Sequence, residues 1–244
     1  MRRLKTIFDD WANHAKGNYS QRQWVLSKWE VLDGIEWPES KIKILLKNIR
    51  ESLQLQRSNS LIDIGCGGGW IQNGLKPYVR GPLGLDISLE MLKTARVAYP
   101  KEDFICADVC RLPTKNESFD RILCYFVFIN FGDPKNIEKA VLEIMRVLKK
   151  GGRALIGQIP DRDYSSQYDS AKKEYLDYCR KTFPVGKNIR DNFLVPVHPW
   201  ERQFFIELMK KEKIAYQIRN SFNPFYRDGQ SQTVEWRFDL VLEK

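Results

Sequence analysis

The feature that most constrains this chain is a run of four glycines within residues 65–69. The apolar segment Leu61–Ile64 leads directly into it and is typical of a buried parallel strand. Glycine lets the backbone turn tightly and approach a ligand closely because it has no Cβ. A helix that begins after such a turn offers unpaired backbone N–H groups to an anion. The sequence therefore predicts a strand, a ligand-binding loop and a helix, in that order.

Loops of this kind bind two classes of nucleotide ligand, dinucleotides and S-adenosylmethionine. The dinucleotide fingerprint G-x-G-x-x-G/A needs a small sixth residue, because the helix packs closely on the strand at that point. Counted from Gly65, the sixth residue is Trp70, which argues against a dinucleotide. Asp63, the acid that precedes the glycines, can instead accept a hydrogen bond from a cationic amine.

Two more acids stand at the ends of strand-like segments further along the chain. Asp86 ends the segment 83–86, and Asp108 follows the segment 104–106. When parallel strands alternate with helices, ligands bind at the carboxyl ends of the strands. An acid at the end of the second strand is placed to accept both hydroxyls of a ribose.

The order D-x-G-x-G-x-G from Asp63 resembles motif I of the class I S-adenosylmethionine-dependent methyltransferases. Four further landmarks follow in that family's order: residues 84–88, 104–109, 119–124 and 146–153, the last similar to the family's LKPGG turn. The resemblance covers about residues 58–160. It implies an α/β, Rossmann-like fold, with a seven-stranded, mostly parallel sheet whose last strand is antiparallel. It also implies S-adenosyl-L-methionine as the cofactor.

The same resemblance implies which residues hold the cofactor. In the family, the acid after the third strand contacts the adenine amino group, and the next backbone N–H meets the ring. Residues 125–131 would then form the loop under the cofactor. The residues expected to bind the cofactor are Asp63, Gly65, Cys66, Gly67, Gly69, Asp86, Ile87, Asp108, Val109, Cys124 and Tyr125.

Segments on either side of the landmarks predict a cap and an insertion. Residues 1–57 show helical spacing and read as an N-terminal helical cap, whereas residues 58–244 form the methyltransferase domain. In the resembling family the first segment often folds over the methionine end of the cofactor. Phe8, Trp11 and Tyr19 are therefore candidates for a pocket wall, with packing inside the cap as the competing interpretation. Residues of about 160–198 exceed an ordinary connection and read as a lid or substrate-binding insertion.

Methyl transfer from a sulfonium requires alignment more than acid–base chemistry. A base is needed only where the acceptor loses a proton, and His198 is the candidate, with a helix-capping or surface role as the alternative. His14 is a second, weaker candidate. The residues expected to contact the acceptor are Tyr19, Asn130, Asp161 and Tyr164.

The net charge of +9 is spread along the chain and forms no basic stripe or tail, so a nucleic-acid surface gains no support from it. The leading expectation is therefore methylation of a small molecule at oxygen or nitrogen. An RNA or protein methyltransferase is the runner-up within the same fold. A catalytically silent S-adenosylmethionine-binding partner protein is the alternative from another class.

Location and metal content follow from what the chain lacks. No run approaches the roughly 20 apolar residues of a membrane helix, and residues 1–14 lack the apolar core of a signal peptide. We therefore expect a cytoplasmic protein without membrane contact. Cys106 and Cys110 resemble half of a metal site, but no second Cys or His pair accompanies them, so we expect no metal.

Overall fold

The computed structural model describes residues 5–6, 8–9, 12–13, 39–166, 197–222 and 233–244. These residues form a seven-stranded sheet with the strand order β3-β2-β1-β4-β5-β7-β6. The strands are β1 (Leu61–Ile64), β2 (Leu83–Asp86), β3 (Asp103–Cys106), β4 (Phe119–Tyr125), β5 (Leu148–Pro160), β6 (Ala215–Phe222) and β7 (Thr233–Glu243). β7 pairs antiparallel with both β5 and β6, whereas β1 to β5 pair parallel. The expected Rossmann-like sheet with an antiparallel last strand is confirmed.

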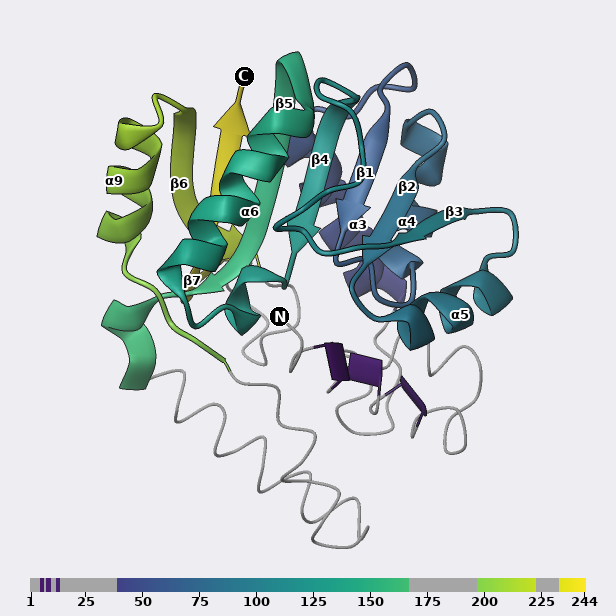
Figure 1. Ribbon diagram of the computed structural model, residues 1–244, viewed down its shortest axis with the longest axis horizontal. Helices are drawn as coiled ribbons and strands as arrows, with labels where there is room; N and C mark the ends of the chain where they lie inside the picture. Colours follow the sequence, from purple (N-terminus) through teal and green to yellow (C-terminus); the bar gives the residue numbers. More distant parts are fainter. Residues whose placement is uncertain (1–4, 7, 10–11, 14–38, 167–196, 223–232) are drawn as a thin grey trace, which may run out of the picture.

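Helices cover both faces of the sheet (Figure 1). α3 (Glu39–Leu53) and α4 (Trp70–Leu75) pack on one face, and α6 (Pro134–Val147) and α9 (Arg202–Lys211) pack on the other. α5 (Leu89–Ala98) lies against β2 and β3. Three 3-10 turns complete the described elements: η1 (Lys76–Tyr78), η2 (Phe128–Asn130) and η3 (Arg162–Tyr164).

The two faces of β4 show how the sequence builds these layers. Successive strand residues point to opposite faces, so Ile122 and Cys124 join the core under α6 and α9. Leu123 and Tyr125 face the other way and join the core under α3. Both faces of the central strands are therefore apolar, as a sheet covered by helices requires.

Two helices begin at side chains that cap their first turn. The Ser88 hydroxyl accepts the backbone N–H of Met91 at 3.1 Å at the start of α5. Asp133 accepts the N–H of Lys135 at 2.9 Å at the start of α6, where Pro134 occupies the first helical position. α6 then buries Ile137, Ala140, Val141, Ile144 and Val147, which share one helical face.

The connections at the carboxyl ends of β1, β2, β3 and β4 meet at one edge of the sheet, which positions the site described next. Most of the expected insertion, residues 167–196, lies outside the described residues. The division into a cap and a methyltransferase domain stays a prediction. In the part of the chain that the structure describes, no helix has the length and apolar character needed to cross a membrane.

Candidate active site

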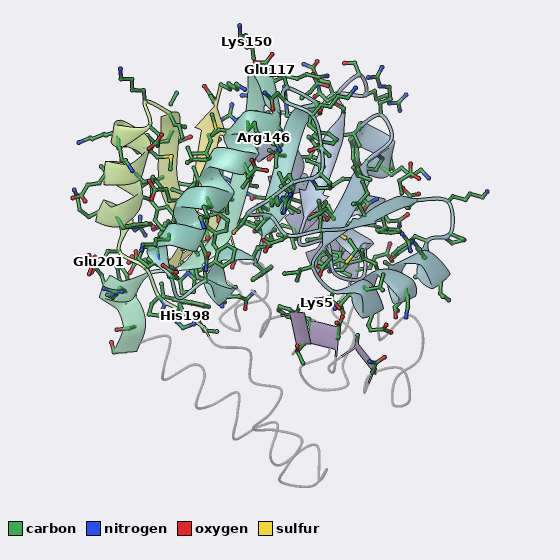
Figure 2. The ribbon with its side chains drawn as sticks, viewed as in Figure 1. Lys5, Glu117, Arg146, Lys150, His198 and Glu201 are labelled. Carbon is green, nitrogen blue, oxygen red and sulfur yellow. The ribbon has the colours of Figure 1, made fainter. Side chains whose placement is uncertain are left out.

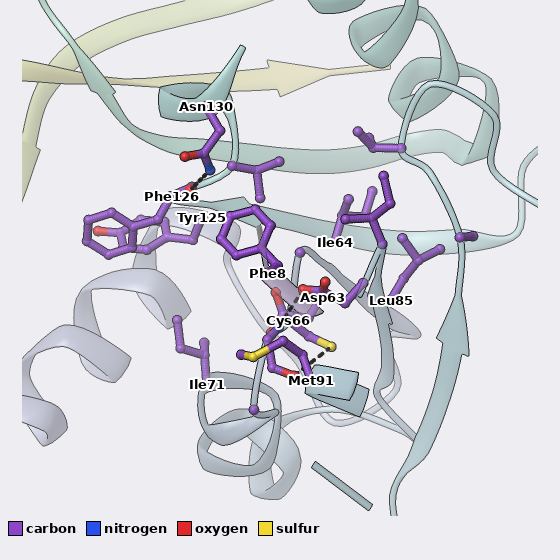
Figure 3. Close-up of a pocket in the computed structure, with 18 of the residues that line it drawn as sticks. Phe8, Asp63, Ile64, Cys66, Ile71, Leu85, Met91, Tyr125, Phe126 and Asn130 are labelled. Carbon is purple, nitrogen blue, oxygen red and sulfur yellow. Dashed lines mark hydrogen bonds between the residues drawn. The ribbon is translucent and has the colours of Figure 1, made fainter. Parts of the chain in front are cut away.

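A pocket opens where the carboxyl ends of β1, β2 and β4 meet (Figure 3). Its walls come from the glycine loop, from the ends of these strands, from α5 and from the N-terminal segment. Of the residues expected to bind the cofactor, the pocket brings together Asp63, Gly65, Cys66, Gly67, Asp86, Ile87, Val109 and Tyr125. Asn130, expected to contact the acceptor, also lines it.

The glycine loop needs its glycines for two separate reasons. Gly65 has a φ of +75°, and a Cβ built on it would lie 2.2 Å from Cγ2 of Val127. Its N–H and that of Cys66 both donate to the carbonyl of Leu85, at 2.6 and 3.0 Å. Gly67 has a φ of +54° and donates its N–H to Oδ2 of Asp86 at 2.8 Å. The loop is therefore tied to β2 and held against the residues that follow β4.

Gly69 is not among the residues that line the pocket, and its expected contact with the cofactor stays a prediction. It precedes α4 with a φ of +80°, and a Cβ there would lie 2.9 Å from the ring of Phe104. Glycine is required at this position because the loop packs closely on Phe104.

Two carboxylates stand together in the pocket. Asp63 is 2% exposed, and its Oδ2 accepts no hydrogen bond from the described residues. Burial, together with the charge of Asp86, raises the pKa of Asp63 to about 7. Asp86 is also buried, but its oxygens accept the backbone N–H groups of Gly67 and Ser88, at 2.8 and 2.9 Å. This concentration of negative charge fits a ligand that carries a cation and hydroxyl donors.

Burial favours the protonated form of the thiols of Cys66 and Cys124 near the pocket. Burial raises the pKa of Cys66 well above its ordinary value, and the neighbouring Asp86 and Asp63 act in the same direction. Cys124 is fully buried in the core under α6, and burial likewise raises its pKa. Its side chain lies outside the pocket lining, and its expected contact with the cofactor stays a prediction. A thiol that stays protonated is a poor nucleophile.

After β3, the pocket is lined by Ala107 and Val109, the residues on either side of Asp108. Asp108 itself is not part of the lining. Its Oδ1 accepts the N–H of Cys110 at 2.8 Å, which holds the carboxylate in its own loop. Its expected contact with the adenine stays a prediction.

The end of β4 supplies the far wall of the pocket. Phe126 has a φ of +61°, which is rare for a residue with a side chain. Its carbonyl accepts the side-chain amide of Asn130 at 3.3 Å, so the loop between them is closed on itself. Val127 and Asn130 line the pocket beside Phe126. Phe126 and Val127 both belong to residues 125–131, the segment expected to form the loop under the cofactor.

Asp161 is buried and engaged by neighbouring residues, and its expected contact with an acceptor stays a prediction. It is 1% exposed, and its Oδ2 accepts Nε of Arg202 at 2.6 Å. Its Oδ1 accepts the N–H of Asp163 at 3.2 Å at the start of η3. Tyr164, in η3, lies outside the pocket lining as well. Both residues follow β5 as expected, and their proposed contact with the acceptor stays a prediction.

His198 lies near the carboxyl ends of the strands, as expected, but outside the pocket lining (Figure 2). Its backbone N–H donates to the carbonyl of Ile129 at 2.9 Å, next to Asn130. Its ring packs on Gly132, where a Cβ would lie 2.8 Å from the imidazole. The expected role of His198 as a general base stays a prediction. Trp11, His14 and Tyr19 lie outside the described residues.

Metal ligands do not gather in the described part of the chain. No three His, Cys, Asp or Glu side chains there come together as a metal centre requires.

Phe8 forms part of the pocket wall, which is the position that the family resemblance suggested for it. Its side chain is 6% exposed and lines the pocket near Asp63, Cys66 and Met91 (Figure 3).

Comparison with known proteins agrees with this geometry. Residues 62–156 match the family model described as a methyltransferase domain. A protein of Methanocaldococcus jannaschii, MJ0638, is 31% identical over 191 residues, which cover 78% of this chain and 73% of that protein. The demethylmenaquinone methyltransferase of Renibacterium salmoninarum is 30% identical over 131 residues, 52% of this chain. This chain spans only 51% of the latter protein.

The fold recurs in a solved structure. The crystal structure of the PH0226 protein from Pyrococcus horikoshii superposes with a TM-score of 0.65 and 17% sequence identity. The match covers 93% of this chain and 99% of that protein. At this identity the likeness concerns the fold alone.

Proposed function

Since this chain belongs to the class I S-adenosylmethionine-dependent methyltransferases, we propose that it transfers a methyl group to an oxygen or nitrogen atom of a small-molecule acceptor. Its cofactor is S-adenosylmethionine. When bound, this cofactor supplies a methyl group already activated on a sulfonium. The remaining work of the protein is to hold the two reactants in line and to exclude water.

The residues in the pocket fit the cofactor. In our proposal Asp86 accepts the ribose hydroxyls, because a buried carboxylate at the end of β2 is an acceptor group suited to the two donors of a diol. Asp63 attracts the cationic amino group, which would give its unpartnered oxygen a donor. Ala107 and Val109 border the place proposed for the adenine. The glycines give the backbone the close approach that this arrangement needs.

The acceptor would lie at the end of the pocket formed by Phe126, Val127 and Asn130. Asn130 offers an amide to orient a hydroxyl or an amine. The two carboxylates face the cofactor in our proposal, so neither is free to act as a general base. The chain would therefore act by alignment, with acceptors that need little help in losing a proton.

One observation carries the small-molecule assignment: a buried phenylalanine from the N-terminal segment, Phe8, forms part of the pocket wall. A site walled on this side favours a compact acceptor that fits inside it over a polymer that lies across the surface. The net charge of +9 is compatible with an anionic small molecule.

A carbon acceptor is a second candidate. The relative from Renibacterium salmoninarum is a demethylmenaquinone methyltransferase by name. The acceptor end proposed here is largely apolar, since Phe8, Phe126 and Val127 line it. An apolar aromatic or quinone ring would find favourable contacts there.

The test is transfer of radiolabelled methyl groups from S-adenosylmethionine to a metabolite extract, to total RNA and to a protein fraction. Label in a low-mass, water-soluble product supports the leading proposal, and label in an organic-solvent extract supports the quinone-like candidate. Label in RNA or protein contradicts both, especially if RNA labelling falls steeply with salt. Cofactor binding without label in any fraction would favour the catalytically silent partner. Asp86→Ala serves as the inactive control.

A further inference from the structure

Asp9, in the N-terminal segment, forms a hydrogen bond beside the cofactor pocket, and the proposed function assigns this residue no role. This segment, of which residues 5, 6, 8, 9, 12 and 13 are described, lies beside the start of α5 (Figure 1). The hydroxyl of Ser88 donates to Oδ1 of Asp9 at 2.6 Å, across 79 positions of sequence. The backbone N–H of Glu90 approaches the same oxygen at 3.4 Å. Asp9 therefore binds the first turn of α5 from outside that helix.

Asp9 is held as an ionised group. Its other oxygen accepts the ammonium of Lys5, one helical turn earlier on the same segment. Burial alone would raise the pKa of Asp9, but the hydrogen bonds from Lys5 and Ser88 outweigh it and lower the pKa. A charged acceptor makes the bond from Ser88 stronger than one between neutral groups.

Ser88 connects Asp9 to the acid proposed for the ribose. Its backbone N–H donates to Oδ1 of Asp86 at 2.9 Å, while its hydroxyl oxygen accepts the N–H of Met91. A serine hydroxyl has one proton to donate, and Asp9 receives it. The other oxygen of Asp86 accepts the N–H of Gly67. A continuous chain of hydrogen bonds thus runs from the N-terminal segment through Ser88 and Asp86 to the glycine loop.

The same segment also makes apolar contacts with the pocket. Phe8, next to Asp9, lines it. Ala12, on the following turn, is fully buried and packs with Met91 and Trp70, both of which line the pocket. Where Asp9 is bound, Phe8 is consequently held over the pocket.

We propose that Asp9 is a positioning residue that acts through Ser88: it latches the N-terminal segment onto the start of α5, so that closure of the pocket by Phe8 and the orientation of Asp86 are coupled. This inference rests on the proposed cofactor site. It adds that S-adenosylmethionine leaves the pocket when the Asp9–Ser88 bond opens. The strength of this bond therefore contributes to the rate of cofactor release.

The test is the rate at which S-adenosylmethionine dissociates from the full-length protein, measured by stopped-flow fluorescence, together with its dissociation constant. Asp9→Ala removes the latch and is expected to speed dissociation about tenfold. Asp9→Asn keeps an oxygen for Ser88 without the charge, so its rate should fall between the two. Ser88→Ala combined with Asp9→Ala should release the cofactor no faster than the faster single variant, because both remove the same bond.

Asp133→Ala is the matched control. Asp133 also bonds the first turn of a helix, α6, but it does not line the pocket. The Asp133→Ala variant should be less stable than the wild type, because it lacks a helix cap, but it should release the cofactor at the wild-type rate. The latch is overturned if Asp9→Ala releases the cofactor at the wild-type rate, or if Asp133→Ala speeds release equally. Failure of the wild type to bind S-adenosylmethionine would instead overturn the cofactor site itself.

Discussion

The carboxylate of Asp86 accepts the backbone N–H of Gly67 at 2.8 Å, although the two residues stand 19 positions apart. This bond joins the end of β2 to the loop that follows β1. The positive φ of Gly67 belongs to the same bend. Asp86 therefore holds the glycine loop in place and also lines the pocket. Its replacement should change both the loop conformation and cofactor binding.

Cofactor affinity should depend on pH through Asp63. Burial and the neighbouring Asp86 raise the pKa of Asp63 to about 7. Only the ionised carboxylate attracts a cationic amino group, so the affinity due to this residue should rise roughly tenfold between pH 6 and pH 8. The quantity to measure is the ratio of wild-type to Asp63→Asn affinity, because the ratio removes the cofactor's own titration. A ratio that stays constant over this range contradicts the role of Asp63.

The same residue should lower the stability of the cofactor-free protein at high pH. Its pKa in the folded state, about 7, exceeds its ordinary value of 3.8. The folded state therefore binds the proton more tightly, and stability is lost as pH rises from about 4 to 7. Asp63→Asn should raise the free energy of unfolding in urea by up to about 4 kcal/mol at pH 8 and have little effect at pH 4. If Asp63→Asn is less stable than the wild type at pH 8, the ionised carboxylate of Asp63 is stabilised in the folded protein, which contradicts this prediction.

Gly65→Ala should destabilise the protein more than Gly151→Ala. Both glycines have a positive φ, +75° and +71°, so alanine strains the backbone by about 1 kcal/mol at either position. Only at Gly65 would the new Cβ also meet Val127, at 2.2 Å, whereas nothing lies within 4 Å at Gly151. We expect a total loss of about 3 kcal/mol at Gly65 in urea unfolding. Val127→Ala in the same chain should recover part of it; equal losses at the two glycines would contradict the contact.

Asp161 should matter for stability and not for the cofactor. Its buried carboxylate pairs with Arg202 at 2.6 Å, and breaking a buried pair leaves a charge without its partner. Asp161→Asn should therefore cost about 3 kcal/mol of unfolding free energy. Its affinity for S-adenosylmethionine, measured below the unfolding transition, should equal that of wild type. Wild-type stability in this variant would show that the pair contributes nothing.

Much of the fold could be predicted from the sequence because its signals are local. An apolar strand, the glycines and an acid at the end of the next strand each have a direct structural meaning. The parallel order of the strands then places Asp63, Asp86 and Val109 at one edge of the sheet. The same reasoning placed Phe8 near the pocket, through the family resemblance.

The parts that could not be predicted depend on partners distant in the sequence. Asp161 follows β5 as an acceptor residue would, but nothing near it indicates that Arg202, 41 positions later, takes up its charge. The packing of His198 on Gly132, 66 positions earlier, likewise depends on how two distant loops fold together. Position after a strand predicts the edge of the sheet on which a residue lies, but not the direction of its side chain.

The most direct measurement of the cofactor site is isothermal titration of S-adenosylmethionine into the wild type, Asp86→Asn and Asp103→Asn. Asp103 is an exposed acid at the start of β3, whereas the pocket lies at the carboxyl ends of the strands. The Asp103→Asn variant therefore controls for the loss of one charge. We expect the wild type and Asp103→Asn to bind with equal affinity, and Asp86→Asn to bind at least about tenfold more weakly. Equal affinity of all three proteins would contradict the placement of the ribose on Asp86, and with it the proposed site.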